Sequence, residues 1–239
     1  MATKCLHFYT YNLRRDTTVM LMFQPPDSEK LYKDQFPVVW KVLTFRAGGH
    51  AKAVVRYCAR LAFGYAQTAS SSILFGPWLL MIHQDDDNFV TSAAWVEVKS
   101  GDQTEIVNSG GGSRFGKKTE GNVSTSRLLV CKNNSKSRAN LSVGFVRGDF
   151  IDQRYDPMLV WRGVGYPMSL GIIKACAQVV LGRSNSECAT TTESQFLRGE
   201  VESDPIWKQD LNVLDDATSW NFIEDESSGE FTIERASQP

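Results

Sequence analysis

Residues 40–57, WKVLTFRAGGHAKAVVRY, contain two short segments rich in β-branched and aromatic residues. The first covers 40–45 and the second covers 51–57, with a five-residue loop between them that contains two glycines. Segments of this composition are typical of β-strands, and a short glycine-containing loop between two of them favours a β-hairpin. The stretch therefore predicts two paired antiparallel strands.

Similar strand signals recur outward from this stretch in both directions. In 141–146, Leu141, Val143 and Phe145 alternate with small residues, as a half-buried strand requires. Further strands are predicted at 19–23, 95–98, 127–131 and 231–233. Residues 169–181 are compatible with a helix or a strand, and their glycine and β-branched residues favour a strand.

One helix is predicted, near residues 205–214. Pro205 follows a capping residue, and Trp207, Leu211 and Leu214 would share one helix face. We expect a mainly β fold: a single-domain antiparallel β-sandwich or barrel-like fold that covers residues 1–239, with this one short helix.

Composition and cysteine spacing indicate an ordinary globular chain. Of the 239 residues, 42% are hydrophobic, 11% aromatic and 22% charged, which excludes a disordered chain. No uncharged run of membrane-spanning length and no signal-peptide core are present, and the five cysteines form no CxxC pair. We therefore expect a cytoplasmic protein with free thiols and no membrane partner.

The net charge of −1 conceals two regions of opposite sign. Residues 200–239 contain eleven acidic and two basic residues, whereas 112–147 contain eight basic and one acidic residue. The basic stretch could meet nucleic acid, but few aromatic residues lie within it to stack on bases. The favoured interpretation is that the acidic tail packs beside the basic stretch.

Two segments resemble sites for phosphate or a metal. Residues 111–118 match most of a phosphate-binding loop, but Lys118 replaces the usual Ser or Thr and a poor helix former follows, so a flexible basic loop is favoured. Asp85, Asp86 and Asp87 offer oxygen ligands to a divalent cation such as Mg²⁺, although a solvated acidic loop is the favoured explanation. No histidine or serine motif for catalysis is present, and we expect no enzyme activity.

Aromatic residues are the richest source of binding chemistry in the sequence. Indole and phenol rings combine a large flat face with a hydrogen-bonding group, which suits an aromatic ligand or a sugar. Trp161 and Tyr166 lie among glycines that permit close approach, and Trp95 lies in a predicted strand. These three residues are our candidate ligand-binding residues.

Several segments, in order along most of the chain, resemble a family of basidiomycete fungal proteins that includes the pink chromoprotein of Pleurotus. They are 36–42, 60–64, 142–146, 197–201, 205–211, 220–221 and 231–233. The resemblance implies an intracellular β-rich protein that holds a small indolone-type pigment, with a divalent metal ion such as Mg²⁺ as a second candidate cofactor. It leads us to expect a non-enzymatic pigment-binding protein.

Two alternatives remain open at this stage. One is a lectin-like or defence protein that binds carbohydrate through surface tryptophans. The other, weaker, is nucleic-acid binding through 112–147. The sequence does not decide whether the chain forms a homo-oligomer.

Overall fold

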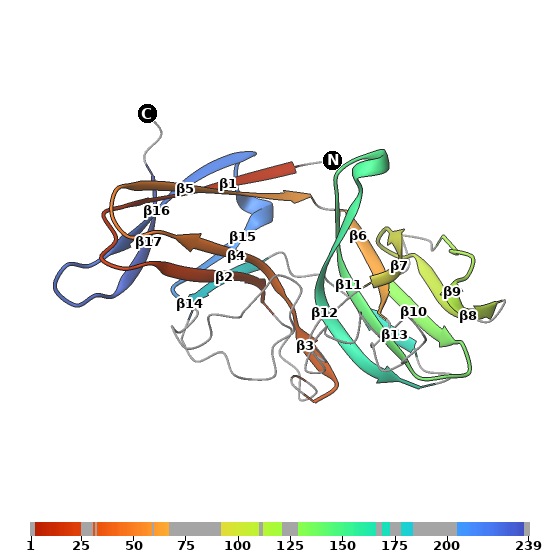
Figure 1. Cartoon of the computed structure of the whole chain (residues 1–239). Helices are drawn as coiled ribbons and strands as arrows, with labels where there is room; N and C mark the ends of the chain where they lie inside the picture. Colours follow the sequence, from red (N-terminus) through yellow and green to blue (C-terminus); the bar gives the residue numbers. More distant parts are fainter. Residues whose placement is uncertain are drawn as a thin grey trace, which may run out of the picture.

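The computed structural model shows a mainly β protein built from four sheets (Figure 1). It describes residues 3–24, 31, 33–58, 60–66, 92–109, 112–120, 129–165, 169–172, 178–183 and 205–236. The sheets stack as in a β-sandwich and, as far as their described strands go, none of them closes into a barrel. The predicted fold class is confirmed.

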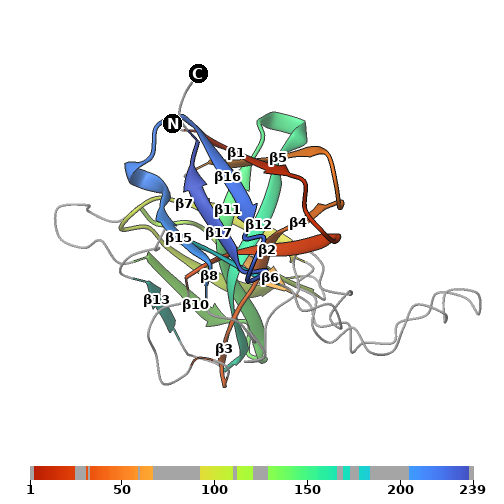
Figure 2. The same ribbon diagram turned by 90° about the vertical axis from the view of Figure 1, so that its left-hand side faces the viewer.

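Two of the sheets form what we call the first half of the molecule, which faces the viewer in Figure 2. In sheet order, one contains β17 (Phe231–Arg235), β16 (Ala217–Glu224), β1 (Thr3–Tyr11) and β5 (His50–Cys58). The other contains β15 (Trp207–Asp210), β14 (Gln178–Arg183), β2 (Thr17–Phe23) and β4 (Val39–Phe45). Their inner faces meet through aromatic rings, such as Phe45 and Phe222 with centroids 5.7 Å apart.

The other two sheets form the second half of the molecule. One contains β3 (Gln35–Pro37), β12 (Arg154–Val164), β11 (Ala139–Arg147), β6 (Leu61–Ala66) and β7 (Ser92–Val98). The other contains β13 (Ser169–Ile172), β10 (Leu129–Asn134), β8 (Gln103–Ser109) and β9 (Gly112–Phe115). Two 3-10 turns, η1 (Phe150–Asp152) and η2 (Leu211–Val213), complete the described elements. No helix in the described ranges is long and apolar enough to cross a membrane.

An aromatic cluster joins the two halves. The ring of Phe145 on β11 lies 4.9 Å from that of Phe23 on β2 and 4.8 Å from that of Tyr57 on β5. Trp40 on β4 lies 4.9 Å from Phe23, and its indole Nε1 donates a hydrogen bond of 3.3 Å to Asp156 on β12. One continuous core of buried residues therefore extends through both halves.

The predicted hairpin at 40–57 is wrong in its pairing, although both strands exist. β4 pairs with β2, whereas β5 pairs with β1 in the other sheet. The loop between β4 and β5 crosses from one sheet to the other and bonds to the loop after β1, with Gly48 donating to the Leu13 carbonyl at 2.8 Å. Gly48 and Gly49 have φ of 71° and 61°, a backbone region that favours glycine.

The predicted helix near residues 205–214 is also wrong over most of its length. Residues 207–210 are strand β15, which pairs with β14, and only 211–213 are helical, as the single turn η2. Trp207, Leu211 and Leu214 are buried as expected, with exposures of 7%, 0% and 7%. Pairing with β14 gives residues 207–210 ladder hydrogen bonds along one side of the strand, which take the place of the hydrogen bonds within a helix.

The acidic tail does not pack beside the basic stretch in the described residues. Strand β16 runs parallel to β1, so the tail lies against the N-terminal strand. Its carboxylates accordingly bind N-terminal groups: Lys4 Nζ lies 3.1 Å from Asp216, and the Arg14 backbone donates to Glu224 at 2.9 Å. The basic stretch belongs instead to β9, β10 and β11 in the second half.

Candidate functional site

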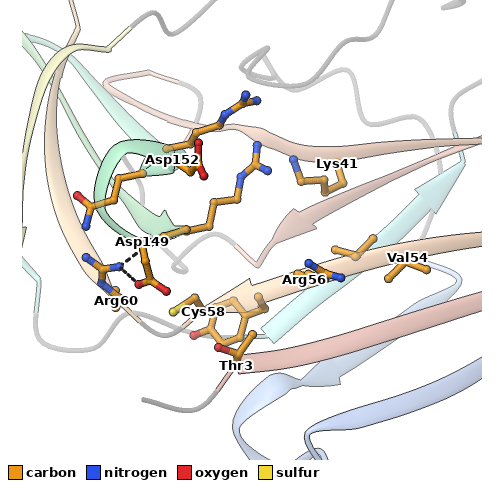
Figure 3. A pocket seen from close by; sticks show the side chains of 14 residues that line it. Thr3, Lys41, Val54, Arg56, Cys58, Arg60, Asp149 and Asp152 are labelled. Atoms are coloured by element: carbon orange, nitrogen blue, oxygen red, sulfur yellow. Dashed lines mark hydrogen bonds and ion pairs between the residues drawn. The ribbon is translucent and has the colours of Figure 1, made fainter.

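A cleft of 1180 Å³ opens where the two halves meet (Figure 3). Four parts of the chain form its walls: the start of β1, β4, the end of β5 with the residues after it, and the connection between β11 and β12. β4 and β5 are the edge strands of their sheets, so this side of the first half is open between them. The volume is slightly larger than the about 300–1,000 Å³ typical of sites that hold small organic molecules, so the cleft has room for one.

Backbone geometry shapes the β11–β12 connection that closes one end of the cleft. Gly148 follows β11 with φ of 76°, and a Cβ at this position would collide with the backbone oxygen of Asp152. Glycine is therefore required for the tight turn that precedes η1. This turn places Asp149 and Asp152 at the cleft, beside Arg147 and Arg154 at the two strand ends.

The cleft has an excess of positive charge. Its lining includes five cationic side chains and two carboxylates, and the cations are Lys41, Arg56, Arg60, Arg147 and Arg154. Four of them lie on strands β4, β5, β11 and β12, and Arg60 lies between β5 and β6. The fold therefore brings together cations that are far apart in the sequence.

Arg60 fixes one wall of the cleft. Its guanidinium donates to both carboxylate oxygens of Glu97 on β7, at 3.1 and 2.7 Å, and to the Gly148 carbonyl at 2.8 Å. The hydrogen bond from Arg60 lowers the pKa of Glu97, and the same bond raises the pKa of Arg60. Arg60 therefore ties the β11–β12 turn to the sheet of the second half.

Arg147 is fixed in a similar way, whereas two other arginines are not. Arg147 Nε lies 3.0 Å from a carboxylate oxygen of Asp156, which also accepts the hydrogen bond from Trp40. Arg56 and Arg154 are exposed, and neither makes a side-chain hydrogen bond or ion pair to any residue in the described ranges. Their donors are available to a ligand.

The chemistry of this arrangement suits an oxyanion. A guanidinium presents planar paired N–H donors that match carboxylate, phosphate or sulfate oxygens. Tyr57, the one aromatic side chain among the described lining residues, is buried, and burial raises the pKa of its hydroxyl above the usual value, so it stays neutral. The half-buried thiol of Cys58 also reaches the cleft.

The candidate ligand-binding residues from the sequence do not line this cleft. Trp95 lies on β7, half-buried and stacked on Tyr155 with ring centroids 6.5 Å apart and planes 12° apart. Trp161 lies on β12 with an exposure of 7% and belongs to the core. Strand register places Trp95 and Trp161 on opposite faces of one sheet, because Trp95 shares a row with Ser142 and Trp161 shares one with Leu141. Tyr166 lies outside the described residues.

The segments singled out for phosphate and metal are placed only in part. Residues 112–115 form strand β9 paired with β8, and Lys118 forms an ion pair of 3.2 Å with Asp102, so this segment is not a phosphate-binding loop ahead of a helix. Asp85, Asp86 and Asp87 lie outside the described residues. Within the described part of the chain, no group of three or more His, Cys, Asp or Glu side chains could hold a metal ion.

Sequence reasoning missed the cleft cations. The one available signal was the segment 147–154, in which two arginines and two aspartates surround a glycine turn. Lys41 and Arg56 lay in correctly predicted strands, but the mistaken hairpin between those strands concealed the open edge where they meet.

No family model, curated protein or solved structure matches the chain.

Proposed function

We propose that the protein is a non-enzymatic binding protein that holds an anionic small molecule in the cleft between its two halves. The observation that carries this proposal is that Arg56 and Arg154, neither paired with a carboxylate in the described ranges, reach the same cleft, whereas Arg60 and Arg147 beside them are already paired with Glu97 and Asp156. Arg56 and Arg154 supply the ligand contacts, while Arg60 and Arg147 hold the walls.

The division between paired and available arginines supports a ligand with several oxyanion groups. Arg56 belongs to the first half and Arg154 to the second, so a ligand that reaches both would bridge the halves. A charge-assisted hydrogen bond to an ionised group contributes about 1.5–3 kcal/mol.

A small molecule fits this site better than a nucleic acid. The cleft cations surround a hollow of 1180 Å³. Nucleic-acid binding needs a groove or stripe of basic residues that follows a backbone, with aromatic side chains on which bases stack. Several basic residues of the stretch 112–147 are moreover engaged within the fold, such as Lys118 with Asp102.

Isothermal titration calorimetry with inorganic tripolyphosphate and with citrate tests the proposal. We expect both probes to bind the full chain, with an affinity that falls as salt is added because the interaction is between charges. The double variant Arg56→Ala with Arg154→Ala should lose about a hundredfold or more in affinity, since each lost bond is worth about 1.4 kcal/mol or more, which is tenfold.

Arg46→Ala is the matched control. Arg46 is exposed in the loop before β5, at the opposite end of that strand from the cleft, and its replacement removes the same charge as each cleft variant. Equal binding by the wild-type protein, the double variant and Arg46→Ala, or no binding of either probe at low salt, would contradict the proposal.

Pigment binding is the second candidate function, and the stacked rings of Trp95 and Tyr155 favour it. These rings lie on β7 and β12, and the Tyr155 hydroxyl is 2.9 Å from Ser142 Oγ, which orients its ring. A flat conjugated molecule such as an indolone would pack against the exposed part of this pair. Visible absorption of protein from its native source is the test; a colourless preparation with no small molecule released on denaturation would rule the pigment out.

A further inference from the structure

Three polar side chains lie in a row on the outer face of β1. Cys5, His7 and Tyr9 occupy alternate positions of the strand, whereas Leu6 and Phe8 between them point into the core with exposures of 0% and 1%. Alternate strand residues share a face, so the spacing Cys-x-His-x-Tyr by itself places these groups together. All three side chains are half-buried and reach the surface.

The distances within the row match an activated nucleophile. Cys5 Sγ lies 3.1 Å from His7 Nε2, and His7 Nδ1 lies 3.5 Å from the Tyr9 hydroxyl. A thiol bonded to an imidazole that a third group orients is the arrangement by which proteins activate cysteine. With the proton on Nδ1 directed to the Tyr9 oxygen, the free electron pair of Nε2 faces the thiol.

The surroundings keep the imidazole ready to accept a proton. Burial and the positive charge of Lys52 lower the pKa of His7, so the ring is neutral at neutral pH. Lys52 lies on β5 opposite Tyr9, with its Nζ 5.2 Å from the tyrosine ring centre, and Arg56 lies opposite Cys5. On the other side of β1, Ser219 of β16 lies opposite His7. Among the described strands of this sheet, the carboxylate that shares this face is Glu234 of β17, which lies opposite Asn221, the partner of Tyr9.

We propose that Cys5 is a site of covalent modification. Its thiol adds to a soft electrophilic carbon, such as the β-carbon of an α,β-unsaturated carbonyl compound. His7 Nε2 takes the thiol proton as Cys5 Sγ forms a bond to the β-carbon and the carbon–carbon π bond breaks. The resulting enolate takes that proton from His7 at its α-carbon, so the saturated thioether forms without an oxidant and His7 returns to its neutral state.

This proposal rests on side chains other than those of the anion site, although Arg56 of that site lies opposite Cys5 in the strand pairing. Cys5 is not among the residues that line the cleft, and the proposed step uses groups on β1 only. Two other cysteines provide internal comparisons: Cys58 is half-buried and has no hydrogen-bonded imidazole among the described residues, and burial raises the pKa of Cys131 to about 12.

Labelling of the native full chain with N-ethylmaleimide tests the proposal. Limited reagent is added at pH 7, the reaction is quenched with excess thiol, and tryptic peptides are quantified by mass spectrometry. Cys5, Cys58 and Cys131 fall in separate peptides, 5–14, 57–60 and 128–132. We expect Cys5 to react at least about tenfold faster than Cys58, a threshold set below the about 10²–10⁴-fold of general-base effects, and Cys131 to stay unlabelled.

Two variants separate the role of His7 from mere exposure of the thiol. His7→Gln should slow Cys5 labelling by about tenfold or more and leave Cys58 labelling unchanged, whereas Tyr9→Phe should cause a smaller loss. The ratio of Cys5 to Cys58 labelling in the wild-type protein tests the proposal even if a variant fails to fold. Equal rates for the two cysteines, or an unchanged Cys5 rate in folded His7→Gln, would overturn the proposal.

Discussion

Arginines in the cleft differ in what their side chains contact. Arg60 and Arg147 are bound to carboxylates of the protein, Glu97 and Asp156; Arg60 donates from all three guanidinium nitrogens, whereas Arg147 donates from its Nε. Arg56 and Arg154 are exposed and keep their donors. The first pair therefore contributes mainly to the shape of the cleft, and the second pair to its affinity for a ligand. Substitutions in the two pairs should have different consequences.

His7 should make stability depend on pH in the acidic range. Its pKa in the folded protein lies below the ordinary value of 6.5, so the unfolded chain binds the proton more readily. The stabilising contribution of neutral His7 is therefore complete above about pH 6.5 and is lost as the pH falls below that value. In urea unfolding followed between pH 8 and pH 5, His7→Gln should lose less stability on acidification than the wild-type protein.

The difference between His7→Gln and the wild-type protein at pH 8 serves as the reference. There the imidazole is neutral in both the folded and unfolded chains, so any difference reflects packing and hydrogen bonds rather than protonation. If the two proteins lose the same stability between pH 8 and pH 5, His7 does not titrate as described.

The β11–β12 turn is the element that Arg60 attaches to the rest of the second half. Replacement by methionine in Arg60→Met removes the bonds to Glu97 and Gly148 while keeping an apolar stem of similar length. We expect a loss of about 1–3 kcal/mol in the free energy of unfolding, measured in urea, because the half-buried Glu97 loses its charged partner. Hydrogen exchange at amides 148–154 should become faster.

Arg46→Met is the control for that experiment, since Arg46 is an exposed arginine in a loop. It should leave both stability and exchange near their wild-type values. If amides 148–154 exchange in Arg60→Met at the same rate as in the wild-type protein, contacts other than those of Arg60 hold the turn.

At the level of elements, the sequence predicted strands well and their partners poorly. The residue pattern at 141–146 correctly indicated a strand, β11, but not its burial: residues 141–146 are buried on both faces rather than on alternate positions, because neighbouring layers cover both sides of this sheet. Pairing is not local: β4 and β5 joined different sheets, and β1 found its parallel partner β16 more than two hundred residues away. In 207–214 the spacing of apolar residues correctly indicated which side chains are buried. The same spacing is compatible with a helix and with a strand followed by a turn, and the structure contains the strand and turn.

The site belongs to the whole molecule, which is why no local motif reveals it. Its cations come from both halves, and the halves are joined by the aromatic cluster of Phe23, Trp40, Tyr57 and Phe145. Tyr57 belongs to both this cluster and the cleft lining, and Trp40 bonds to the carboxylate that holds Arg147. Packing at the junction thus determines how far apart Arg56 and Arg154 lie. That distance cannot be predicted from a local sequence pattern.

The structure of the protein with bound tripolyphosphate, determined by crystallography, tests the anion-binding cleft most directly. We predict polyphosphate density in the cleft, with oxygens within hydrogen-bonding distance of the guanidinium groups of both Arg56 and Arg154. Density confined to the basic residues of β9 and β10, or a cleft that contains only water at a saturating concentration of the probe, would contradict the assignment of this cleft as the ligand site.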